Sequence, residues 1–176
     1  MEKYILTSKR LTLVPFILED AKEFQLLNND SNIRKYLWDN EEVDAITVDD
    51  IMDKSIVHFE EDQYGLWRIQ LRNNGPAIGY TGLWPFFEEP QPQLVCALQY
   101  PFTRKGYATE ACTAIMDYAF EQLGFNHLIG ATEESHFASQ RVAIKLGMVL
   151  VEKRMEHNRP ILVYRRDKRD TIVRSA

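Results

Sequence analysis

A short basic turn leads directly into an amphipathic helix, and this junction restricts the fold more than any other part of the chain. The turn reads TRKGYA at 103–108. Gly106 tolerates a left-handed backbone, and amides at the start of a helix have no acceptor within it. With the charges of Arg104 and Lys105, such amides form a site for an anion such as a phosphate. Taken alone, the turn is more simply explained as a basic loop before a core helix.

The helix after the turn carries one stripe of small and aliphatic side chains. They recur at three- and four-residue spacing: Ala108, Ala111, Cys112, Ile115, Ala119 and Leu123. A stripe of this kind lets a helix lie close against a sheet.

Hydrophobic periodicity and turn residues predict the remaining elements. Strands are expected at 10–16, 66–72, 77–84, 93–99, 127–132, 149–155 and 160–165, and helices at 18–27, 32–37, 47–59, 108–123 and 136–146. The NNGP segment at 73–76 predicts a hairpin turn, Thr47 is expected to cap the third helix, and 39–44 reads as a solvated acidic loop. Gly124 and Gly147 stand where left-handed helix ends belong.

Length and composition exclude several classes of protein. The 176 residues suit one domain over 1–176, and a net charge of -5 argues against nucleic-acid binding and favours basic or amine-bearing partners. Cys96 and Cys112 fall inside an expected strand and helix, so we expect reduced, buried thiols. The histidines show no paired ligand spacing, so no metal is expected. No segment approaches the ~20 apolar residues of a membrane span, and a cytoplasmic protein is expected.

The chain contains, in order, four characteristic segments: SKRLTLVPFILEDA (8–21), AIGYTGL (77–83), TRKGYATEA (103–111) and HFASQRVAIKLGM (136–148). Their order and spacing resemble the GNAT superfamily of N-acetyltransferases, and within it the branch that includes the ribosomal-protein alanine N-acetyltransferases. The resemblance covers nearly the full chain. It implies an α+β (α/β) fold: a mixed, mostly antiparallel sheet of about seven strands, splayed between the fourth and fifth, with helices on both faces.

The same resemblance implies a site for acetyl-coenzyme A, the acetyl donor. Its pyrophosphate is expected on the turn and helix start, at Arg104, Lys105, Gly106, Tyr107, Ala108 and Thr109. Its pantetheine arm is expected to pair with the fourth strand at Leu98, Gln99 and Tyr100, as a peptide adds to a sheet edge. The thioester then lies near Thr132 and Glu133.

Four residues depart from the family pattern. Thr103 stands where arginine or glutamine is usual, and Arg104 where this branch often has glycine, so Arg104 keeps a negative φ or bears a strain of about 1 kcal/mol. His136 replaces an asparagine and either contacts the cofactor or only caps the helix. Gln93 replaces a glutamate and is no base at neutral pH.

The implied chemistry is direct attack of an amine on the thioester. Ser139 is the candidate to donate a proton or hydrogen bond to the departing sulfur, or it is an ordinary polar residue in a first helical turn. Glu133, or Glu134, is the candidate to assist deprotonation, or a partner of the helix dipole. Main-chain amides of the fourth strand are expected to polarise the carbonyl.

The acceptor is the least determined part of the prediction. WPFFEE at 84–89, with Trp38 and the acidic 39–42 segment, is a candidate lining for an amine-accepting cleft, although core packing explains some of these rings. The resemblance suggests a peptide or protein N-terminal α-amine. A small-amine or antibiotic acetyltransferase and a non-catalytic coenzyme A sensor are the alternatives, and a monomer or homodimer is expected.

Overall fold

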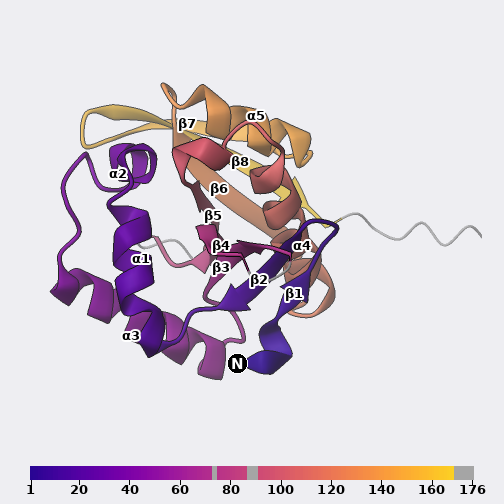
Figure 1. Cartoon of the computed structure of the whole chain (residues 1–176). Helices are drawn as coiled ribbons and strands as arrows, with labels where there is room; N and C mark the ends of the chain where they lie inside the picture. The colour runs from indigo at the N-terminus through magenta and orange to yellow at the C-terminus, as the bar shows by residue number, and fades with distance from the viewer. Residues whose placement is uncertain (73–74, 87–90, 169–176) are drawn as a thin grey trace, which may run out of the picture.

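The computed structural model describes residues 1–72, 75–86 and 91–168 (Figure 1). Its strands are β1 (Leu6–Thr7), β2 (Leu11–Pro15), β3 (Leu66–Leu71), β4 (Ala77–Trp84), β5 (Gln93–Leu98), β6 (His127–Glu133), β7 (Val149–Glu156) and β8 (Arg159–Asp167). Its α-helices are α1 (Ala21–Asn28), α2 (Ser31–Leu37), α3 (Ala45–Glu61), α4 (Tyr107–Glu121) and α5 (Phe137–Lys145), with 3₁₀ turns η1 (Glu2–Tyr4), η2 (Leu18–Asp20) and η3 (Tyr100–Phe102).

The strands form two hydrogen-bonded sheets. The first has the order β1-β2-β3-β4-β5 and the second β6-β8-β7, and the neighbours within each sheet are antiparallel. Helices α1 to α3 lie on one side of the first sheet and α4 on the other (Figure 1). The predicted fold class is confirmed. The two-residue strand β1 was not predicted from the sequence.

The two sheets meet along β5 and β6 without forming a ladder in the described part of the chain. Gln91 Nε2 donates to the carbonyl of His127 at 3.2 Å, and a Cβ built on Gly130 would lie 3.4 Å from the carbonyl oxygen of Leu94. From the first contact to the second, both chains advance by three residues, from Gln91 to Leu94 and from His127 to Gly130. The two strands therefore run in the same direction and touch near their beginnings. The gap therefore opens towards their carboxyl ends, which is the predicted splay.

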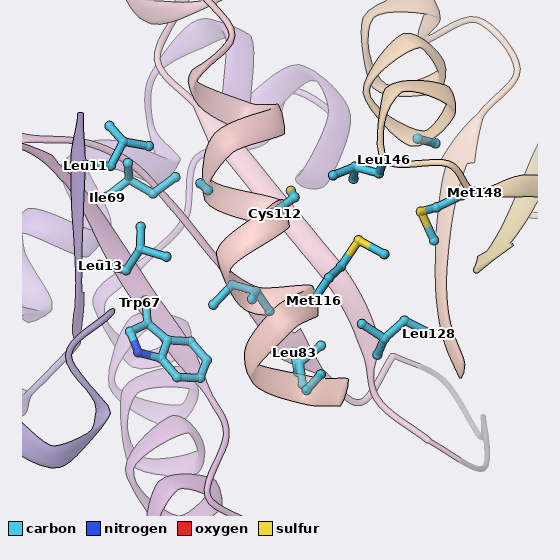
Figure 2. Packing of buried hydrophobic residues seen from close by; sticks show 14 of the residues in the cluster. Leu11, Leu13, Trp67, Ile69, Leu83, Cys112, Met116, Leu128, Leu146 and Met148 are labelled. Carbon is cyan, nitrogen blue, oxygen red and sulfur yellow. The ribbon is translucent and has the colours of Figure 1, made fainter. Parts of the chain in front are cut away.

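Helix α4 packs against both sheets through its apolar stripe. Figure 2 shows Cys112 and Met116 between side chains of the first sheet, such as Leu13 and Trp67, and Leu146 and Met148 on the opposite side. A separate apolar cluster under α1, α2 and α3 covers the other face of the first sheet. The predicted burial of the α4 stripe is confirmed.

Both late helices end as predicted. Gly124 and Gly147 each have a φ of 73°, and the amides that follow reach back across the last turn. The amide of Phe125 donates to Ala119, and that of Met148 to Ala143, each at 3.0 Å. At Gly147 these are the bonds of a Schellman ending, with the Gly147 amide also donating to the carbonyl of Ile144 at 2.9 Å, while at Gly124 the bond reaches one residue further back. Both endings turn the chain into the next strand.

The predicted cap of the third helix is wrong by three residues. Helix α3 begins at Ala45, and Asp44 Oδ1 accepts from the amide of Thr47 at 2.7 Å. Asp44 is thus the capping residue, and the acidic segment is not all solvated, because Val43 is buried. The β3–β4 hairpin is confirmed by its pairing, while Asn73 and Asn74 of its predicted turn lie outside the described residues.

We expect Gly82→Ala to lower the free energy of unfolding by about 3 kcal/mol, because a Cβ at Gly82 would lie 2.1 Å from the Gly65 carbonyl oxygen. Urea unfolding measures the change. Gly75→Ala is the matched control, since its nearest neighbour, the Leu71 Cβ, lies 3.7 Å away. Equal stabilities of the two variants would contradict this reading of the β3–β4 contact.

Candidate active site

The turn before α4 presents a run of unpaired backbone amides. In the described part of the chain, no hydrogen bond is made by the amides of residues 104–109, and the first amide of the helix that is bonded is that of Glu110, to Gly106 at 3.0 Å. Gly106 has a φ of 83°, as predicted. Six consecutive free donors beside two exposed cations fit a diphosphate, so the residues present suit the implied donor.

For Arg104, the sequence left open either a negative φ or a strained backbone, and the structure shows the strained one. Its φ is 58°, in the left-handed region that glycine occupies without strain. A non-glycine residue there costs about 1 kcal/mol or more, and such strain persists only where surrounding contacts hold it. The contacts that hold this turn come from β2.

Arg10, at the start of β2, braces the turn from outside. Its guanidinium donates to the carbonyl of Lys105 at 3.0 Å and lies 4.4 Å from the ring centroid of Tyr107. Arg10 Nε and Glu110 Oε2 are 2.6 Å apart, and Ser8 Oγ donates to Glu110 Oε1 at 2.7 Å. These contacts lock the carbonyl side of the turn and leave its amide side open. Sequence analysis missed this brace.

We expect Arg10→Met to raise the Kd for coenzyme A about tenfold, because the turn loses the contacts that pre-organise its amides. Isothermal titration calorimetry measures the affinity. Lys9→Met removes the same charge one residue earlier, from an exposed side chain, and should change Kd by less than about twofold. Equal losses in both variants would attribute the effect to charge alone.

The end of β5 presents its backbone to the gap. The amide of Gln99 donates to Ile78 on β4 at 3.0 Å, so strand alternation directs the amide of Leu98 to the opposite side, towards β6. The Leu98 carbonyl accepts from Asn32 Nδ2 at 2.9 Å. Tyr100 lies in η3, with an exposed ring. Of the three residues predicted for the pantetheine arm, Leu98 thus has the amide that faces the gap.

The candidate catalytic residues lie where β6 passes into α5. Ser139 is half-buried in the first turn of α5, and its hydroxyl makes no hydrogen bond within the described residues. Glu133, the last residue of β6, accepts from Arg159 at 2.8 Å and from Ser135 Oγ at 3.1 Å. Arg159 also pairs with Asp39. Both oxygens of the Glu133 carboxylate are therefore engaged, Oε1 by Arg159 and Oε2 by Ser135, which favours a positioning role for this side chain.

His136 does not cap α5, because its side chain makes no cap hydrogen bond. Its ring instead stacks on Tyr36 of α2, with the ring centroids 3.5 Å apart and the planes 1° from parallel. Burial lowers the pKa of the His136 imidazole, against the opposing effect of the Glu133 carboxylate and with the help of Lys35. The ring is therefore neutral at pH 7.

We expect the free energy of unfolding to fall as the pH drops below about 6.5, partly because of His136. Its pKa is lower in the folded state, so the unfolded chain takes up the proton first as the pH falls. Urea unfolding at pH 7.5 and 5.5 measures the loss. His136→Phe keeps a ring for the stack without the titration and should lose less; an identical loss would contradict this assignment.

Helix α2, with Trp38 and Asp39 that follow it, contacts elements on both sides of the β5–β6 gap. Asn32 bonds to β5, Tyr36 stacks on the start of α5, and Asp39 pairs with Arg159 at the start of β8. In Figure 1, the β7–β8 hairpin reaches over towards α2. Nothing in the local sequence signalled these contacts, because each joins residues far apart in the chain.

Three of the rings predicted for an acceptor cleft come together. Trp38, Trp84 and Phe86 line one cavity of about 150 Å³ beneath α1 to α3, with Tyr80 and Val95 of the first sheet. Phe87, Glu88 and Glu89 of the same predicted lining lie outside the described residues. The acidic residues predicted at 39–42 follow Trp38 in the chain and are not among the residues that line this cavity.

Both cysteines are free as predicted, but only Cys112 is buried, and Cys96 is half-buried. Their mutual hydrogen bond, followed by burial, raises the pKa of Cys96 well above its usual value. Within residues 1–72, 75–86 and 91–168, no cluster of three or more potential metal ligands is found. No helix among these residues is long and apolar enough to cross a bilayer.

The sequence profile of the acetyltransferase (GNAT) domain matches residues 10–149. The chain belongs to the GNAT acetyltransferase family. It is 27% identical over 144 residues to YnaD of Bacillus subtilis (strain 168), described as an uncharacterized N-acetyltransferase, and covers 81% of each chain. It is similar in fold to an acetyltransferase from Agrobacterium tumefaciens str. C58, with a TM-score of 0.80, 24% identity and coverage of 93% and 94%.

A second solved structure of similar fold is RimL, described as a ribosomal L7/L12 alpha-N-protein acetyltransferase in complex with coenzyme A. Its TM-score is 0.78, at 15% identity, and the match covers 93% of this chain and 97% of that one. Membership of the GNAT family makes this protein an acyltransferase that takes its acetyl group from acetyl-coenzyme A. The free amides at 104–109 and the gap beyond Leu98 are the parts of this chain that fit the donor.

Proposed function

We propose that this protein moves the acetyl group of acetyl-coenzyme A directly to a primary amine, the α-amine of a peptide or protein N-terminus. The observation that carries the proposal is the run of six free amides that follows the end of β5, the strand that has no ladder to β6 in the described part of the chain. The first feature suits the diphosphate, and the second exposes a strand edge on which an amide-containing arm can pair.

In the proposed reaction, the neutral amine nitrogen bonds to the thioester carbon, the carbon–sulfur bond breaks, and the nitrogen gives up one proton to solvent, so that the products are an amide and, once the thiolate is protonated, coenzyme A. The Leu98 amide, which faces the gap, supports the oxyanion that forms in between. The Ser139 hydroxyl supplies a hydrogen bond or proton to the departing thiolate. Glu133, held by Arg159, keeps the end of β6 and the start of α5 in place.

The proposal does not need a dedicated base. An α-amine has a pKa of about 8, so a useful fraction is unprotonated at neutral pH. A lysine side chain, with a pKa of about 10.4, would be mostly charged and would require one. The pairing of Glu133 with Arg159 therefore favours an α-amine over a lysine acceptor. The description of RimL as an alpha-N-protein acetyltransferase points to the same class of acceptor.

Incubation with labelled acetyl-coenzyme A and matched acceptors tests the proposal. We expect transfer to peptides with a free N-terminus and none to the same peptides blocked at that end. Mass spectrometry locates the acetyl group. Binding of coenzyme A without transfer to peptides, polyamines or aminoglycosides would instead identify a sensor.

We expect Ser139→Ala to lower kcat about a hundredfold, because the leaving thiolate loses its donor. The Kd for coenzyme A should change much less, since the free amides of 104–109 are untouched. Single-turnover kinetics measures the effect, and Ser139→Cys, which keeps a donor, should recover part of the rate. Full kcat in Ser139→Ala would remove this residue from the mechanism.

A further inference from the structure

The cavity beneath α1 to α3 is lined by aromatic and aliphatic residues. Among them are Phe24, Trp38, Ile51 and Trp84, and no charged side chain contributes to the lining. Its floor includes Tyr80 of β4 and Val95 of β5. Trp38, Ile51 and Trp84 remain partly exposed, so the cavity opens to the surface rather than being sealed within the core.

The polar side-chain atoms of Trp38 and Tyr80 on these walls are already paired. Trp38 Nε1 and the Tyr80 hydroxyl both donate to Asn28 Oδ1, each at 2.7 Å. Asn28 is fully buried, and its Nδ2 donates to the carbonyl of Phe24 at 2.9 Å. A ligand in the cavity therefore finds contact surface without a free donor or acceptor on these groups, which selects apolar groups over hydroxylated ones.

Two segments of the chain connect the cavity to the β5–β6 gap. Val95 lies on β5, three residues before Leu98, whose amide faces the gap. Trp38 is followed directly by Asp39, which pairs with Arg159, and Arg159 binds Glu133 at the end of β6. The same short segment thus forms one wall of the cavity and one contact across the gap.

We propose that this cavity receives an apolar, benzene-sized group next to the amine that is acetylated, as in an N-terminal phenylalanine or leucine. The inference rests on the proposed acetyl transfer and names its acceptor class. An apolar cavity of about 150 Å³ is large enough to bind benzene, and the cavity here, which is open to the surface, has a volume of about 150 Å³. Polyamines and aminoglycosides, which are charged or hydroxylated throughout, do not suit such walls.

Charge in the segment that follows Trp38 narrows the class of acceptor further. Glu41 and Glu42 are exposed in the segment that follows Trp38. Arg34 faces Glu42 at 3.4 Å, a long contact with a carboxylate that is 82% exposed. The carboxylates attract the ammonium form of an amine and repel a free carboxylate beside it. Peptides, amino-acid amides and arylalkylamines therefore fit better than free amino acids.

The test compares kcat/KM for glycinamide, leucinamide, phenylalaninamide, free phenylalanine and spermidine, by detecting released coenzyme A. We expect phenylalaninamide and leucinamide to exceed glycinamide about tenfold or more, and free phenylalanine to fall below its amide. Similar values for glycinamide, spermidine and phenylalaninamide would overturn the inference while leaving acetyl transfer intact.

Two substitutions at Ile51 change the cavity in opposite directions. Ile51→Phe fills it and should bring the ratio of phenylalaninamide to glycinamide close to one. Ile51→Ala enlarges it and should shift the preference towards tryptophanamide. Ile46→Phe is the matched control: this isoleucine lies on the same helix, is 81% exposed, and should keep the original ratio. An unchanged ratio in both Ile51 variants would overturn the inference.

Direct binding separates this inference from the proposed function. Titration with 2-phenylethylamine, followed by tryptophan fluorescence, should saturate in the unmodified protein and in Ile46→Phe and weaken in Ile51→Phe. Saturation without acetylation of any amine would refute the transfer reaction and support the cavity as a ring site. Failure of the amine to bind would overturn the inference even if glycinamide is acetylated.

Discussion

The absence of a hydrogen-bonded ladder between β5 and β6, in the part of the chain that the structure describes, is the constraint on which the rest depends. Unpaired strand edges are costly to leave inside a protein, because backbone donors and acceptors need partners. Here Gln91, just before β5, bonds to the start of β6, and Gly130 of β6 lies close to Leu94 of β5. Helix α4 holds the sheets together from one face through buried side chains, and α2 does so from the other through polar and ring contacts.

In the proposed reaction, binding and chemistry rely mainly on the backbone. The amides of 104–109 and of Leu98 are set by the turn, by the helix start and by strand alternation, so the departures at Thr103, Arg104 and Gln93 leave them in place. Side chains act around this frame. Arg10 bonds to the turn before α4. Arg159 pairs with both Glu133 and Asp39, so Glu133, a candidate base in the sequence analysis, takes part in a contact that joins the two sides of the gap.

Local patterns in the sequence predicted what depends on neighbouring residues. The α4 stripe, the left-handed Gly106 and the glycine endings of two helices all follow from periodicity and φ preferences, and the resemblance supplied the splay. The capping error arose because Asp44 and Thr47 both suit a cap, and the structure uses the earlier one. The brace between Arg10 and Glu110, the bond from Asn32 to Leu98 and the pair of Asp39 with Arg159 join residues 100, 66 and 120 positions apart. Polar contacts over such separations leave no periodic signal.

The position of β8 sets the order in which the molecule can be completed as it is synthesised. In the described chain, β6 and β7 each pair with β8 alone, and β8 is the last strand to leave the ribosome. The strands of the first sheet all lie before residue 99, so that sheet can form while translation continues. The second sheet has to wait for its central member. A nascent chain stalled before Arg159 would therefore expose β6 and β7 without their partner strand and would lack the arginine that holds Glu133. Chaperones bind chains with unpaired strands of this kind.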